Sequence, residues 1–165
     1  MARSPLVAAA TALLRTAPVM RAPIWLYRAR LGALLGPRLL MLEHRGRRSG
    51  LPRYVVLEVL GRPEPGRYLV ASGFGEKAQW FRNITADPRV RVTVGSHAPA
   101  PATAHRLPQP EADRALAAYI EAHPRAWARF REVLERTLGT PVTAVNTALP
   151  IVAVTVEAGD LPGYC

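Results

Sequence analysis

The ten residues HRGRRSGLPR, His44 to Arg53, hold four arginines, a serine and two glycines. An apolar run at residues 39–42 precedes them, and a run typical of a β-strand follows at residues 54–60. The stretch is therefore predicted to connect two strands. Such a connection gathers backbone N–H groups, a hydroxyl group and several guanidinium groups, a combination that suits a phosphate. A solvated turn is the alternative interpretation of the same composition.

A second cluster, ASGFGEKAQWFRNITADPRV at Ala71 to Val90, favours an anion site. A strand predicted over residues 67–72 ends in a glycine-containing turn, and a short helix is expected to begin near Glu76 or Lys77. The unpaired N–H groups and the positive dipole end of a helix attract anions. Lys77 is the only lysine in a chain with 21 arginines, and it lies in the first turn of this helix.

Together the two clusters resemble a known family. GRRSGLPR at residues 46–53, followed by GEKAQWFRNITADPRV at residues 75–90, is similar to the paired signature of the deazaflavin-dependent nitroreductase family. Members of this family bind coenzyme F420 on a split β-barrel. The resemblance is close over residues 39–108. It implies an oxidoreductase that transfers a hydride from the reduced deazaflavin to an electron-poor acceptor, such as a quinone, a nitroaromatic compound or an activated double bond.

The resemblance also implies which residues hold the cofactor. The arginine loop would bind the phosphate and the acidic tail, and Lys77 would complete this clamp. Backbone atoms of two strand segments would flank the ring system, while Trp80 and Asn83 would shape the pocket, with Asn83 partly structural. The cofactor-binding residues implied in this way are Arg47, Arg48, Ser49, Gly50, Arg53, Val55, Val56, Ser72, Gly73, Lys77, Trp80 and Asn83.

One part of the family pattern is missing. The best-known nitroreductases carry several tyrosines in the helix before the last strand, where they line the acceptor pocket. Here the helix reads HPRAWARFREV, with Trp127 and Phe130 but no tyrosine. Reduction of nitroimidazole prodrugs therefore does not follow from the resemblance. Tyr54, Tyr119 and Tyr164 are candidate proton donors, and no catalytic residue is assigned.

The composition argues against several other chemistries. The four histidines are scattered and the single cysteine is Cys165, so no residues have metal-ligand spacing and no metal site is predicted. A single cysteine also excludes an internal disulfide, which fits a reducing compartment. Ser49 lacks the flanking pattern of a hydrolase nucleophile. The chain fits an enzyme whose cofactor carries the chemistry.

Positive charge is concentrated toward the N-terminus, where residues 1–60 hold ten arginines against two glutamates. Such a field attracts nucleic acids, acidic membranes and polyanionic cofactors alike. Nucleic acid is disfavoured, because no reader motif is present and the basic residues are not interleaved with stacking aromatics. Residues 1–37 are predicted to form basic amphipathic helices that pack on the barrel or contact a membrane surface. A cytoplasmic location is expected, with membrane association as the alternative.

The rest of the sequence predicts an α+β fold, a small antiparallel barrel with peripheral helices over residues 38–165, and the resemblance implies that this is a split β-barrel of the FMN-binding type. With residues 1–37 it would form one structural domain. Alternating polar and apolar residues predict half-buried strands. Strands are predicted at residues 39–45, 53–60, 67–72, 89–94 and 149–157, a hairpin loop at 61–66, and a proline-interrupted edge strand within 98–107.

Two helices are predicted at residues 110–122 and 124–138, the second ending at Gly139. The second helix bears Trp127, Phe130, Val133 and Leu134 on one side, which predicts a packed face. Two other functions stay open: an oxidoreductase that uses FMN on the same fold, and a non-enzymatic protein that binds anions or membrane surfaces. The expected partner is a small-molecule electron acceptor, and a homodimer is expected by analogy with other split barrels.

Overall fold

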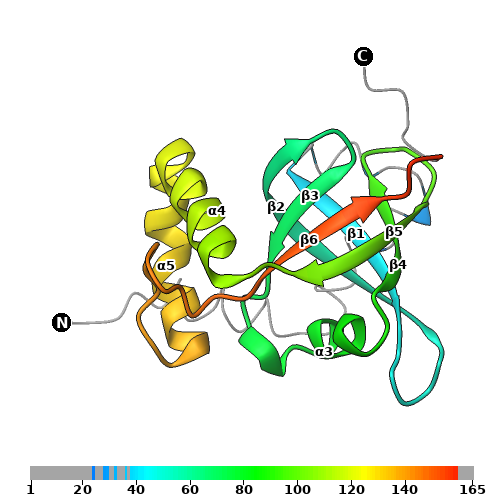
Figure 1. The fold of residues 1–165 in the computed structure, drawn as a ribbon, viewed down its shortest axis with the longest axis horizontal. Helices are drawn as coiled ribbons and strands as arrows, with labels where there is room; N and C mark the ends of the chain where they lie inside the picture. Colours follow the sequence, from blue (N-terminus) through cyan, green and yellow to red (C-terminus); the bar gives the residue numbers. More distant parts are fainter. Residues whose placement is uncertain (1–23, 25–27, 30–31, 33–35, 37, 160–165) are drawn as a thin grey trace.

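The structure is a computed structural model that describes residues 24, 28, 29, 32, 36 and 38–159. Its centre is a closed antiparallel barrel of six strands in the order β1-β2-β3-β6-β5-β4 (Figure 1). The strands are β1 (Leu39–Arg45), β2 (Pro52–Glu64), β3 (Arg67–Ala71), β4 (Arg89–Val94), β5 (Ala100–Arg106) and β6 (Ile151–Val156). The predicted antiparallel barrel and the α+β class are confirmed.

The helices lie outside the barrel (Figure 1). A 3-10 turn, η2 (Gly75–Lys77), leads into α3 (Gln79–Ala86), which lies across one end of the barrel, whereas α4 (Gln109–Ala122) and α5 (Pro124–Leu138) pack together at its side. Proline at the first helical position suits the start of α5. Gly139 ends this helix with a φ of 74°, a left-handed conformation that glycine adopts without strain.

Two apolar clusters hold these layers together. Inside the barrel, inward-facing residues such as Leu42, Val92 and Val154 pack against Trp80 and Phe81 of α3. β4 shows why the strands form, since Val90, Val92 and Val94 are buried while Arg89 and Arg91, which alternate with the first two valines, are exposed. A second cluster between the barrel and the paired helices α4 and α5 is centred on Leu116, Val142 and Ile151. Burial of Trp80 and Phe81 in the first cluster places α3 over the barrel end where the arginine loop emerges.

β2 is longer than predicted and includes most residues of the expected hairpin loop. The strand continues to Glu64, with register shifts after Val59 and Gly61, and the turn is confined to Pro65 and Gly66. Such bulges let one strand pair with different neighbours along its length. The predicted loop at 61–66 is therefore mostly strand.

β5 is not an edge strand, so this prediction was wrong. It pairs with β4 on one side and with β6 on the other. The ladder with β6 begins at Ala102, one residue after Pro101, and the Pro101 carbonyl accepts from the N–H of Glu157 at 3.0 Å just past β6, so this ladder does not need the N–H that proline lacks. Closure of the barrel then leaves β5 paired on both sides.

The predicted packed face of α5 is only half formed. Trp127 and Leu134 pack partly buried against the second cluster, but Phe130 and Val133 keep 47% and 46% of their surface exposed. No helix among the described residues is long and apolar enough to cross a membrane. The helices predicted within residues 1–37 fall largely outside the described residues, and the division at residue 38 stays a prediction.

Candidate cofactor site

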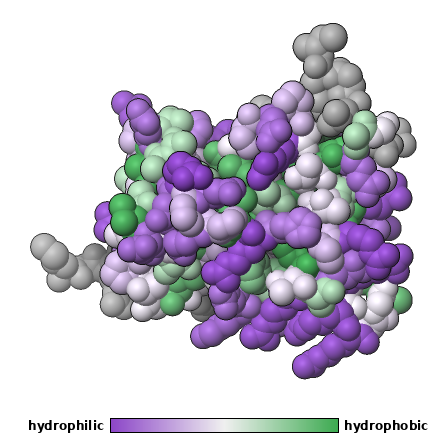
Figure 2. Space-filling view, in the orientation of Figure 1, coloured by the Kyte–Doolittle hydropathy of each residue, from purple (hydrophilic) through white to green (hydrophobic). Residues whose placement is uncertain are grey.

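A pocket of about 900 Å³ opens where the β1–β2 loop, β2, the turn after β3 and α3 meet, and Thr137 of α5 borders it. This volume is typical of cofactor and small-molecule sites. Figure 2 shows hydrophilic side chains gathered over the lower part of the face, where α3 and the β1–β2 loop lie. Ten of the twelve residues expected to bind the cofactor line the pocket: Arg47, Arg48, Ser49, Arg53, Val55, Val56, Gly73, Lys77, Trp80 and Asn83.

The other two, Gly50 and Ser72, do not line it. Gly50 is at the tip of the arginine loop, where its φ of +67° allows a tight turn and its N–H donates to the carbonyl of Gly46 at 2.7 Å. Ser72 is fully buried, and its hydroxyl group donates to the Gly75 carbonyl at 2.7 Å. Both residues therefore shape the turns that carry pocket-lining neighbours.

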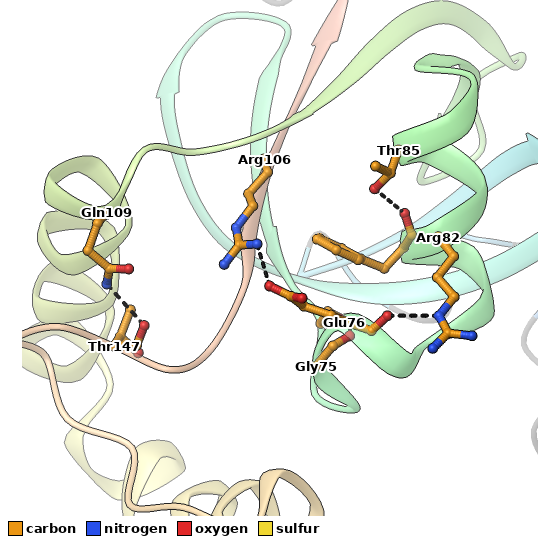
Figure 3. Close-up of polar contacts among 9 residues, drawn as sticks. Gly75, Glu76, Arg82, Thr85, Arg106, Gln109 and Thr147 are labelled. Carbon is orange, nitrogen blue, oxygen red and sulfur yellow. Dashed lines mark hydrogen bonds and ion pairs between the residues drawn. The ribbon is translucent and has the colours of Figure 1, made fainter.

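Cations at the pocket have no carboxylate partners. Within the part of the chain that the structure describes, Arg48, Arg53 and Lys77 form no ion pair with an acidic side chain. Glu76, the acid next to Lys77 in sequence, instead pairs with Arg106 of β5, as Figure 3 shows. No acidic side chain of the described residues therefore neutralises these three cations by an ion pair, which suits an anionic ligand.

The arginine loop is fixed to α3 through Arg47. The backbone N–H of Arg47 donates to Oδ1 of Asn83 at 3.2 Å, and its Nη1 donates to the same oxygen at 3.0 Å. The same Nη1 also donates to Oε1 of Gln79 at 2.9 Å. The loop thus has a defined position against the first turns of α3 before any ligand binds.

Behind the loop lies a buried polar pair, His44 and Asn83, exposed by 4% and 5%. Nδ2 of Asn83 lies 3.2 Å from Nδ1 of His44. Burial lowers the pKa of His44 to about 4, a shift that Arg53 reinforces by its charge and the backbone of Arg45 opposes. The imidazole is neutral at pH 7 as a result.

One edge of β2 is open toward the pocket. Among the described residues, β2 pairs with β1 from Pro52 to Glu58, whereas its ladder with β3 begins only at Val59. Residues 53–57 line the pocket. Backbone N–H and C=O groups that point away from β1 in this segment are therefore available to a ligand, as at the edge of any sheet.

Aromatic residues border the pocket on two sides. Trp80 is 8% exposed, lines the pocket and also packs edge-on against Phe81 at 6.0 Å between ring centroids. It is thus both a core residue and a pocket residue, while Phe81 belongs to the core. Phe74, in the turn after β3, lines the pocket with 62% of its surface exposed.

Of the three candidate proton donors, Tyr54 lines the pocket. Tyr119 does not line it. This residue lies on the buried face of α4, and its hydroxyl group donates to Glu58 at 3.0 Å. Burial, together with this acceptor, raises the pKa of Tyr119 to about 12. Tyr164 lies outside the described residues, as does Cys165. No cluster of His, Cys, Asp and Glu in the described residues could hold a metal ion.

Sequence reasoning missed several pocket residues as ligand contacts. They are His44, Gly46, Leu57, Ala71, Phe74, Ala78, Gln79 and Thr137. His44 could have been predicted from the sequence, because strand alternation places it on the same inward face as Leu40 and Leu42. Thr137 carried no such signal, because only the packing of α5 brings it to the pocket.

The barrel and the cations of its pocket, which pair with no carboxylate of the described residues, are typical of the class of proteins that bind a large anionic cofactor. The sequence matches the family described as F420H(2)-dependent quinone reductase over residues 19–147. The chain belongs to this family. It is thus a deazaflavin-dependent oxidoreductase with coenzyme F420 as its cofactor, and its substrate is a small-molecule acceptor.

Solved structures share the fold. One is an F420-H2 dependent reductase (FDR-A), with a TM-score of 0.50 and 24% identity over 71% of this chain and 93% of that one. A structure described as a domain-swapped dimer has a TM-score of 0.50 and 22% identity over 81% and 99% of the two chains. A protein of unknown function from Agrobacterium tumefaciens has a TM-score of 0.50 and 20% identity over 86% and 60%. No match was found among curated proteins.

Proposed function

We propose that this chain uses reduced F420, held in the 900 Å³ pocket, to reduce a quinone. The observation that carries the proposal is the division of the pocket into two parts. Arg48, Arg53 and Lys77 line the pocket without carboxylate partners among the described residues, and apolar side chains that include Val55, Leu57 and Phe74 line the rest of it. A ligand that is anionic at one end and planar and apolar at the other matches both parts.

The cationic part fits the phosphate and the glutamate carboxylates of F420. Guanidinium groups bind such oxygens through paired N–H donors, and Lys77 supplies a point charge beside them. Ser49 is already used within the loop, since its hydroxyl oxygen accepts from the N–H of Leu51 at 3.3 Å. We therefore assign the main electrostatic role to Arg48, Arg53 and Lys77, and a positioning role to the loop turns.

The open edge of β2 fits the ring system. Backbone groups of Val55 and Val56 would hydrogen-bond the polar edge of the ring, and Gly73 lines the same pocket. Trp80 and Ala78 close the inner side of the pocket and exclude water. When bound and reduced, F420 supplies the hydride, and the residues named here bind it, orient it and keep its surroundings dry.

The apolar border supports a quinone as the acceptor. Thr137 of α5 lines the pocket, and Val133 and Phe130 precede it on the same helix face at spacings of four and three residues. Both side chains are exposed, and Phe74 is exposed at the pocket itself. An acceptor with an apolar ring or tail would cover these side chains, and the description of the family names quinones.

A fluorescence titration with F420, run beside FMN, tests the cofactor part of the proposal. We expect saturable binding of F420 at micromolar or lower concentration and much weaker binding of FMN. Steady-state reduction of a quinone by F420H2 tests the acceptor part, with a nitroaromatic compound and an activated double bond as competitors. Binding of F420 without quinone reduction would reject only the acceptor assignment.

A homodimer is a second proposal, supported by the exposed apolar side chains of α5 and by the similar structure described as a domain-swapped dimer. Light scattering measures it directly. A solution mass of about 36 kDa, twice the 18.0 kDa chain, is expected, and a mass of 18.0 kDa at micromolar concentration would reject it. Membrane contact through residues 1–37 stays a prediction.

A further inference from the structure

The side-chain oxygen of Asn83 accepts two hydrogen bonds, and these fix the orientation of the amide. Its Oδ1 accepts from the backbone N–H and from Nη1 of Arg47, at 3.2 and 3.0 Å. An amide oxygen only accepts and an amide NH₂ only donates, so reversal of the amide would place donors against donors. Nδ2 must therefore face His44, where it lies 3.2 Å from Nδ1.

This geometry assigns the tautomer of His44. Nδ1 faces a donor, so it must carry the lone pair, and the ring proton lies on Nε2. The groups around the ring keep it uncharged: Arg53 is its register partner on β2, Arg47 lies beyond Asn83, and the ring is almost completely buried. A charged imidazole here would face two cations and an N–H donor, with no carboxylate contact among the described residues.

The arrangement of His44 and Asn83 fixes the position of Arg47. Its Nη1 is shared between Asn83 and Gln79, while Nε and Nη2 make no hydrogen bond within the described residues. Arg47 lines the pocket. Its remaining donors are thus held in one place on the pocket wall, beside the cations proposed to bind the anionic side chain of F420.

We propose that His44 is a positioning residue for the anionic side chain of F420, because its Nδ1 orients Asn83 and Asn83 orients Arg47. The inference rests on the proposed cofactor site. His44 acts through two intervening residues and needs no contact with the reacting atoms. Its role concerns binding of the phosphate and carboxylates and leaves binding of the ring to other residues.

Two substitutions separate this role from simple packing. His44→Leu replaces the imidazole with an apolar side chain of similar size and so removes the hydrogen-bond acceptor. His44→Asn instead places an oxygen near the position of Nδ1. The same change at an exposed histidine on a strand, His105→Leu, is the matched control. Each protein is titrated with F420 and with the deazaflavin core that lacks the phosphate and glutamates.

His44→Leu is expected to raise the Kd for F420 about tenfold and to change the Kd for the phosphate-free core less than about twofold. His44→Asn should restore most of the affinity, and His105→Leu should leave both constants unchanged. In a double variant with Arg47→Ala, the effect of His44→Leu on F420 binding should largely disappear. Equal losses for both ligands, or equal losses in the Leu and Asn variants, would overturn the inference.

A direct measurement covers the case in which His44→Leu does not fold. ¹⁵N NMR of the wild-type imidazole at pH 7 should show a protonated Nε2 and an unprotonated Nδ1. A proton on Nδ1 would overturn the inference, whatever the variants do. Failure of the wild-type protein to bind F420 would instead reject the proposed site and leave the tautomer result standing, so the two failures are distinguishable.

Discussion

Arg106 on β5 forms an ion pair with Glu76 in the turn before α3, and it thereby holds the acidic residue that precedes Lys77 in sequence away from the pocket (Figure 3). The guanidinium group of Arg106 also lies 5.9 Å from the centre of the Phe81 ring. Both partners of the ion pair are about half exposed or more. The pair therefore contributes little to stability, and its main effect is on the charge beside Lys77.

Loss of this ion pair should weaken cofactor binding without unfolding the protein. In Arg106→Ala the Glu76 carboxylate is released next to Lys77, so we expect the Kd for F420 to rise about two- to fivefold, with a change in the free energy of unfolding below about 0.5 kcal/mol. Adding Glu76→Gln should reverse most of the loss in affinity. An unchanged Kd in Arg106→Ala would show that the carboxylate does not reach the pocket.

Removal of a pocket cation should have a larger effect. Arg48→Ala and Lys77→Ala are each expected to raise the Kd for F420 about tenfold, because each loses a charge-assisted contact. The loss should shrink as salt is added, since screening weakens the same contacts in the wild-type protein. Arg125→Ala, which removes an exposed arginine on α5 that does not line the pocket, is the control. Similar losses in all three variants would indicate a general charge effect.

The apolar border can be tested through the acceptor. Phe74→Ala should lower kcat/KM about three- to tenfold for a quinone with an isoprenoid tail, because the exposed ring would lose apolar contact with it. The Kd for F420 should change less than about twofold. Leu51→Ala removes another exposed apolar side chain, one outside the pocket, and should have no effect. An equal loss with a tail-less quinone would argue against tail recognition.

Gly75 has no room for a side chain. Its φ is +63°, and an added Cβ would lie 2.9 Å from Cδ2 of Leu138 on α5. Gly75→Ala should therefore lower the free energy of unfolding by about 1–3 kcal/mol and weaken F420 binding through displacement of the turn that carries Phe74 and Lys77. Denaturant unfolding measures the first effect. Gly95→Ala, also at positive φ but with open space around it, isolates the backbone contribution.

The buried histidine predicts a specific pH dependence. The pKa of His44 is about 4 in the folded protein and near 6.5 in an unfolded chain, so between these values only the unfolded chain binds the proton. Stability should therefore fall as the pH is lowered from 6.5 to 4, by an amount on the order of 3 kcal/mol from this group, and be unaffected by it above 6.5. The curve of His44→Asn should lack this component. Parallel curves for the two proteins would contradict the burial of a neutral imidazole.

Much of the barrel could be predicted from the sequence, because its strands alternate strongly. β1 and β4 have the predicted bounds, and α5 ends at Gly139 as expected. The edge assignment of residues 98–107 failed because a strand residue directs its N–H to one side only, and a proline is tolerated between two strands where no ladder needs that N–H. Here the β6 ladder begins after Pro101, a fact of register that no local pattern contains.

The cofactor site also has features that the sequence predicts and features that depend on packing. The chemistry of the loop and of the α3 turn follows from the sequence alone, since the cations, glycines and family signature are adjacent along the chain. Which of these cations lack an acidic partner among the described residues depends on tertiary packing, because Arg106 is 30 residues from Glu76 and meets it through the barrel. Tertiary packing also decided that Arg47 is held by Asn83, and Asn83 by His44, across separations of 36 and 39 residues. Hydrogen bonds and ion pairs act over a few ångströms in space, so packing of the strands and helices had to bring these partners together.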